Sequence, residues 1–117
     1  MAKQQLTKKG NNMANIGNVV ITKEWANLQD LIRAQIDDRS AFTFNSTKTY
    51  SLIVDTGVSV DAMGAYYCET TTKPTEINAG NPIEPCEQVI FEFTDGVPLW
   101  VKVRGSGDVA RISIDEK

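Results

Sequence analysis

Apolar and polar residues alternate along the second half of the chain, in runs of strand length. The clearest run is 87–94, in which Val89, Phe91 and Phe93 share one face, because side chains two residues apart in a strand point the same way. Asp95-Gly96 follows it, and this dipeptide is typical of a tight turn between two paired strands. The pattern therefore predicts a small antiparallel meander with strands at 65–69, 87–94, 99–104 and 109–114.

The first half of the chain holds the one segment with helical periodicity. Trp25, Leu28 and Ile32 are spaced three and four residues apart, which places them on one side of a helix. We expect an amphipathic helix over about residues 22–37, with Glu24 near its positively charged amino end. Its apolar side is suited to covering a sheet, because its polar side is mixed in charge rather than basic. Short strands are expected around it, at 17–21, 41–44 and 47–55.

A chain of 117 residues has room for one domain with one core. Residues 1–16 are polar and without periodicity, so we expect an extended N-terminal arm, followed by a single domain over 17–117. The segment 70–85 contains three prolines, and a loop of this length either carries function or is held by a neighbouring element. The expected fold class is mainly β: a small antiparallel β-sandwich or meander with one covering amphipathic helix.

Charge is unevenly distributed along the chain. The net charge is −3, but residues 1–14 carry Lys3, Lys8 and Lys9 and no acid, so the rest of the chain carries −6. An acidic body argues against nucleic-acid binding, which needs clustered Lys and Arg. No apolar run approaches the ~20 residues of a membrane helix, and the start lacks the apolar region of a secretory signal. We therefore expect no nucleic-acid or membrane partner, and synthesis in the cytoplasm.

The chain contains no histidine, which removes the commonest general base and the commonest metal ligand. Cys68 and Cys86 are its two thiols, and two cysteines alone do not supply the four ligands of a structural zinc site. We expect no catalytic residue, no metal and no cofactor, and hence no enzyme. The thiols form a disulfide if the strands beside them are adjacent; cytoplasmic synthesis favours two free thiols.

Aromatic residues are the remaining candidates for a functional site. Tyr66 and Tyr67 are neighbours in an expected strand and so point to opposite faces. Trp100 is out of phase with Leu99 and Val101, so it faces outwards if those two face the core. An outward Trp here indicates a protein interface, a sugar-binding platform or a sheet covered on both faces by the helix. The interface interpretation agrees with the enrichment of Trp and Tyr at protein–protein contacts.

Short motifs follow one another in an order that resembles a known family. They are WANLQDLI over 25–32, YSL over 50–52, KPT over 73–75, GNPI over 80–83 and PLWV over 98–101. Their order resembles the layout of the small β-sandwich virion proteins of tailed bacteriophages. Members of that family are capsid decoration proteins or modules of head fibres and tail attachments. The resemblance spans about residues 17–114.

The resemblance implies a virion structural protein that decorates and stabilises the capsid by oligomeric binding to the head lattice. It implies a homo-oligomer, with a trimer as the expected form, whose arm reaches its neighbours and whose partner is a major capsid or fibre protein. It carries over no catalytic residue. A head-fibre or tail-associated adaptor, or a carbohydrate- or receptor-binding module, is the alternative. The candidate interface residues are Lys3, Lys8, Lys9, Tyr66, Tyr67, Pro74 and Trp100.

Overall fold

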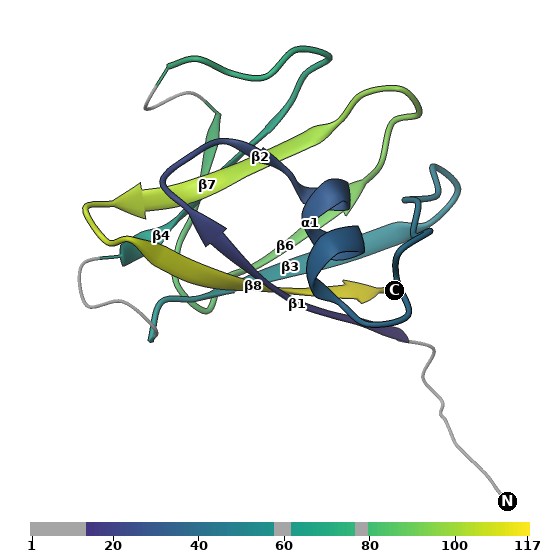
Figure 1. Ribbon diagram of the computed structural model, residues 1–117, viewed down its shortest axis with the longest axis horizontal. Helices are drawn as coiled ribbons and strands as arrows, with labels where there is room; N and C mark the ends of the chain where they lie inside the picture. The colour runs from purple at the N-terminus through teal and green to yellow at the C-terminus, as the bar shows by residue number, and fades with distance from the viewer. Residues whose placement is uncertain (1–13, 58–61, 77–79) are drawn as a thin grey trace, which may run out of the picture.

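The computed structural model describes residues 14–57, 62–76 and 80–117, which form two antiparallel four-stranded sheets packed as a sandwich (Figure 1). Sheet A has the strand order β1-β8-β3-β6, and sheet B has the order β2-β7-β4-β5. The mainly β class predicted from the sequence is confirmed. The elements are β1 (Ala14–Thr22), β2 (Ala26–Asn27), α1 (Leu28–Gln35), β3 (Thr49–Asp55), β4 (Ala62–Glu69), β5 (Asn81–Ile83), β6 (Gln88–Glu92), β7 (Leu99–Gly105) and β8 (Val109–Glu116).

The core lies between the sheets and is built by alternation along their strands. Leu52 and Val54 of β3 lie beside Ile114 and Ile112 of β8, and all four side chains are fully buried. Sheet B faces them with side chains such as Val101 of β7. Burying one such side chain contributes about 1.5–3 kcal/mol. The alternation that predicted the strands therefore also places the apolar side chains through which the two sheets pack together.

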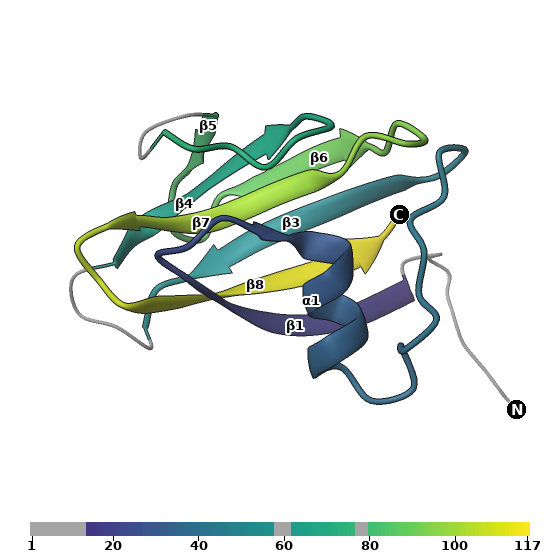
Figure 2. The same ribbon diagram turned by 45° about the horizontal axis from the view of Figure 1, so that its top comes forward.

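The last three strands are paired differently from the expected meander. β6 belongs to sheet A, β7 to sheet B and β8 again to sheet A, so the chain crosses between the layers at both connections (Figure 2). The hairpin expected at Asp95-Gly96 is therefore wrong, and β7 pairs with β2 and β4 instead. The physical reason is that a strand with one apolar face, such as that of Leu99, Val101 and Val103, can complete either layer of a sandwich.

The helix expected over 22–37 is wrong at its start. α1 begins at Leu28 because Asn27 caps it: Asn27 Oδ1 accepts a backbone N–H of the first turn at 3.0 Å. Trp25 consequently lies outside the helix. Leu28 and Ile32 are fully buried, so the apolar side of the helix is as predicted. It packs against β1 of sheet A and against β2 and β7 of sheet B, and so closes one open side of the sandwich (Figure 2).

Residues 41–44, expected as a strand, form no regular element. Side chains of α1 bond the backbone groups that a strand partner would otherwise have bonded. Arg33 Nε donates to the Phe42 carbonyl at 2.6 Å. Gln29 Oε1 accepts the Phe44 N–H at 2.9 Å. The ring of Phe44 then inserts into the core, so the apolar residues of this segment are buried without a strand.

Two further boundaries differ from expectation. β1 begins at Ala14, inside the expected arm of 1–16, because Ile16 is buried in the core. The expected loop 70–85 contains β5, which pairs with β4 and places Ile83 in the core. The core therefore also contains apolar side chains, Ile16 and Ile83, from segments whose sequences do not alternate between apolar and polar residues.

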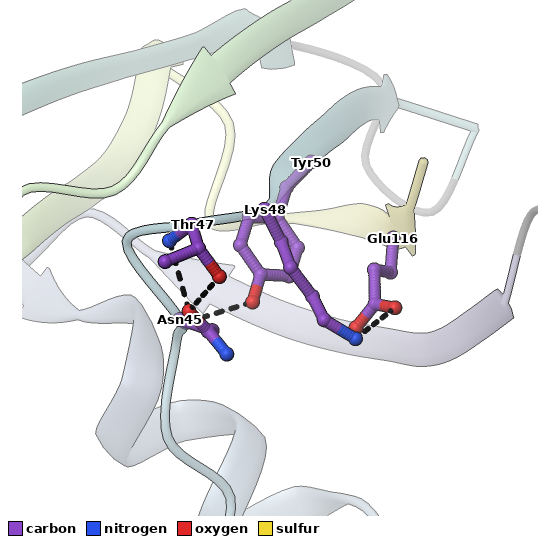
Figure 3. A network of polar contacts seen from close by, with 5 residues as sticks. All are labelled: Asn45, Thr47, Lys48, Tyr50 and Glu116. Atoms are coloured by element: carbon purple, nitrogen blue, oxygen red, sulfur yellow. Dashed lines mark hydrogen bonds and ion pairs between the residues drawn. The ribbon is translucent and has the colours of Figure 1, made fainter.

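A polar network ties the start of β3 to the end of β8 (Figure 3). Asn45 Oδ1 accepts the N–H and the hydroxyl of Thr47 at 2.8 and 2.6 Å, and the Asn45 N–H donates to Tyr50 Oη at 2.8 Å. Lys48 Nζ lies 2.8 Å from Glu116 Oε2. This hydrogen bond raises the pKa of Lys48 above its ordinary value.

Candidate interaction surface

The outer face of sheet B carries most of the aromatic candidates. Trp100 lies on this face, since Leu99 and Val101 beside it point into the core. Tyr66 lies beside Lys102 in the register of β4 and β7, so it shares the outer face. Tyr67 is opposite Val101 and packs against the core instead. The structure thus separates the two tyrosines, as their adjacency requires.

Both tryptophans of the chain form hydrogen bonds that hold the loop after β4 against this outer face. Trp100 Nε1 donates to the Thr70 carbonyl, and Trp25 Nε1 donates to the Glu76 carbonyl, each at 2.9 Å. Trp25 is only 7% exposed, and the Lys102 ammonium lies 5.9 Å from the centre of its ring. Of the three interpretations of an outward Trp, a sheet covered on both faces fits best, although a loop and Trp25 provide the cover rather than the helix.

A hollow of about 310 Å³ lies beside this loop. It is lined by Trp25 and Pro74, by three lysines and by two glutamates. Charges of both signs therefore meet there, which gives the hollow no strong preference for an anion or a cation. A second hollow of about 260 Å³ lies at one end of the sandwich, where the rings of Phe44 and Phe93 meet polar groups such as Asp95. Neither hollow brings together an arrangement of acid, base and nucleophile.

Ion pairs on the outer side of sheet B are local. Arg104 Nη1 lies 2.8 Å from Glu84 Oε1, and this hydrogen bond holds the pKa of Arg104 above its ordinary value, with a smaller contribution from Tyr66. Both partners reach into solvent, so such a pair contributes little to stability. Arg104 also forms a hydrogen bond with Tyr66, so the pair lies beside this tyrosine.

Among the described residues, the sandwich has four outer strands, and three of them have protected edges. The edge of β1 is bonded by a side chain of α1: Gln35 Oε1 accepts the Val20 N–H at 2.7 Å, and Gln35 Nε2 donates to the Val20 carbonyl at 2.9 Å. β5 is three residues long and has Pro82 at its centre, which removes a backbone donor. β2 is two residues long and leads directly into α1.

β6 is the outer strand without such protection in the described part of the chain. β3 is its one strand partner there. Ile90, at its centre, is 50% exposed, and Gln88 and Glu92 beside it are exposed as well. The sequence reasoning missed Ile90, although the signal that found Trp100 applies to it, because Ile90 is out of phase with Val89 and Phe91.

The two cysteines are free thiols. Cys68 lies in β4 opposite Trp100, and Cys86 lies exposed in the connection between β5 and β6, where its N–H donates to the Val54 carbonyl at 2.8 Å. Lys3, Lys8 and Lys9 lie outside the described residues.

In residues 14–57, 62–76 and 80–117, no three His, Cys, Asp or Glu side chains come together as ligands for a metal ion. The described helix is also too short and too polar to cross a membrane. Comparison with protein-family models, with curated proteins and with solved structures finds no match to this chain. The site must therefore be interpreted from its own geometry.

Proposed function

We propose that the chain is a bacteriophage virion structural protein, which binds the head lattice as a homo-oligomer and stabilises it without catalysing a reaction. The order of motifs that resembles small virion proteins supports this function. The geometry that supports it is a sandwich in which one outer strand of the described chain, β6, has an open edge while the other outer strands are protected. The partner under this proposal is the major capsid protein, and the chain resides in the virion.

The open edge of β6 is the observation that carries the proposal. An unpaired strand edge is a template for association, and proteins that act alone normally block it with charge, proline or a covering element. β1 is blocked by a covering side chain and β5 by a proline, whereas β6 has neither in the described part of the chain and presents Ile90 to solvent. A strand kept open in this manner suits a subunit that is completed by contact with other chains.

A carbohydrate-binding module is less well supported. Stacking on a sugar needs an open aromatic face. The Trp25 ring is buried, and the indole N–H groups of both Trp25 and Trp100 are already bonded to loop carbonyls. A head-fibre or tail-associated adaptor belongs to the same class as the proposed function, and copy number distinguishes it.

The test is to count copies of this chain in gradient-purified particles of the phage that encodes it, by quantitative mass spectrometry against the major capsid protein. A decoration protein is expected at a number comparable to the lattice sites, whereas a fibre or tail adaptor is expected at far fewer copies. Absence of the chain from intact particles would overturn the proposed function.

A matched pair of variants tests whether the copy number on particles depends on the open edge of β6. Ile90→Lys places a charge at the open edge, and Met63→Lys places the same charge at another exposed apolar residue, which is 59% exposed. Under the proposal, Ile90→Lys lowers occupancy on particles and Met63→Lys retains it. Equal occupancy of the two variants would show that β6 takes no part in attachment.

A further inference from the structure

The edge of β6 has a definite chemistry that narrows what can pair with it. On its outer face β6 presents Gln88, Ile90 and Glu92 in alternation. The stretch 85–96, which contains β6, carries three carboxylates, those of Glu87, Glu92 and Asp95, and no Lys or Arg. A strand that adds here must therefore bring an apolar side chain for Ile90 and positive charge for the carboxylates.

A second copy of β6 does not meet this requirement. Pairing two such edges would bring two sets of three carboxylates together, and like charges across an interface oppose association. Residues 1–13 of the chain do meet it, because they contain Lys3, Lys8 and Lys9 and no acid. The charges of the two segments, +3 and −3, are complementary.

The spacing of residues also matches. Gln4, Leu6 and Lys8 are spaced two residues apart, as Gln88, Ile90 and Glu92 are. In a parallel register that sets Leu6 beside Ile90, Lys8 comes beside Glu92 and Gln4 beside Gln88. We infer that residues 3–9 of a second copy of this chain add to the outer edge of β6 in this register, in the manner of β-strand addition.

The geometry favours a second copy over the same chain. β1, which begins at Ala14, and β6 are the two outer strands of sheet A, so an arm that adds outside its own β6 must span four strand spacings, roughly 19 Å. From Lys9 to Ala14 the chain reaches at most about 18 Å. The direct path runs past Lys117, whose N–H is bonded to the Thr49 carbonyl. A neighbouring subunit has no such constraint.

This inference rests on the proposed function and names the contact between copies of the chain. Its test uses the isolated protein, so the inference and the proposed function can each be disproved separately. Unlabelled and ¹⁵N-labelled chains are co-refolded, cross-linked with a carbodiimide, which joins an amine to a carboxylate at zero length, and digested. We expect Lys8–Glu92 links, many of which join one labelled and one unlabelled peptide. Links confined to single-isotope pairs, or no links from the arm to β6, would overturn the inference.

Charge reversal tests the register. Lys8→Glu is expected to weaken self-association about tenfold in light scattering, and the double variant Lys8→Glu with Glu92→Lys is expected to restore it. Lys9→Glu makes the same charge change on the opposite side of the added strand and is expected to weaken association much less. Failure of the double variant to restore association would overturn the register.

Discussion

Gln35 bonds both backbone polar groups of Val20 with its side-chain amide, accepting from the N–H at 2.7 Å and donating to the carbonyl at 2.9 Å. The amide reproduces the pairing that a neighbouring strand would offer. β1 therefore has hydrogen-bonded neighbours on both sides at this point, although it is an outer strand of sheet A. The contrast with β6 is what distinguishes a closed edge from an open one.

Replacing Gln35 by Met should lower the free energy of unfolding by about 1–2 kcal/mol, because two hydrogen bonds are lost and Met has a similar helix propensity. Urea denaturation measures the change. Ala34→Gln, which adds an amide at the neighbouring exposed helix position, serves as the control and should have little effect. Equal stability of Gln35→Met and the original chain would mean that the edge is held by packing alone.

Replacing Trp25 or Trp100 by Phe should loosen the loop that follows β4, because each change removes one indole donor to a loop carbonyl. We expect the amides of residues 71–75 to exchange about tenfold faster in hydrogen-exchange mass spectrometry. Tyr67→Phe removes a polar atom from a ring that packs against the core and should leave the loop unchanged. If the loop amides exchange at the original rate in both Trp variants, the indole hydrogen bonds do not stabilise the loop.

Replacing Gly64 by Ala should destabilise the domain by at least about 2–3 kcal/mol. Its φ is +124°, and an added Cβ would lie 2.1 Å from the Ile83 carbonyl oxygen, where β4 meets β5. Gly96→Ala is the matched control: its φ is +78°, but no atom lies within 4 Å of an added Cβ. It should cost only about 1 kcal/mol, in thermal or urea unfolding. If the two variants lose a similar free energy of unfolding, the short distance between the added Cβ and the Ile83 carbonyl oxygen is not the cause.

Replacing Ser51 by Ala should raise the free energy of unfolding by up to about 1 kcal/mol. Ser51 is fully buried, and its Oγ has no hydrogen-bond partner in the described structure, so the hydroxyl is desolvated without compensation. Ser113→Ala, on the neighbouring strand, removes a 2.6 Å hydrogen bond to Asn18 Oδ1 and should lower stability slightly. A loss of stability in Ser51→Ala would indicate a bound water or partner at Oγ.

The strands were predictable because each needs only a local pattern. Alternation in 47–55 and 99–104 places apolar side chains on one face whichever strand lies beside it. The partner of a strand is not encoded in this way, so Asp95-Gly96 indicated a turn but not the sheet into which it leads. The start of α1 was predicted wrongly for a similar reason. Thr22 and Asn27 are both of residue types that cap helices, and only the Asn27 side chain accepts a hydrogen bond from the first turn of α1.

The candidate surface was predictable only in part. Alternation identified Trp100 as an outward residue, and the same argument applied to Ile90 would have identified the open strand. The role of the tryptophans could not be predicted, because the carbonyls that Trp100 and Trp25 bond lie 30 and 51 residues away along the chain. Such contacts depend on the tertiary arrangement, which no local spacing reveals.

The position of β8 has a consequence for synthesis. β8 lies inside sheet A, between β1 and β3, and a hydrogen bond from Ser113 to Asn18 spans 95 residues. While a ribosome is still producing the stretch before residue 109, β1 has no strand to join, and sheet A exists at most as its β3–β6 half. Closure of the layer must therefore wait for the nascent chain to emerge that far, and dependence on such distant contacts slows folding and lengthens the time during which chaperones can act.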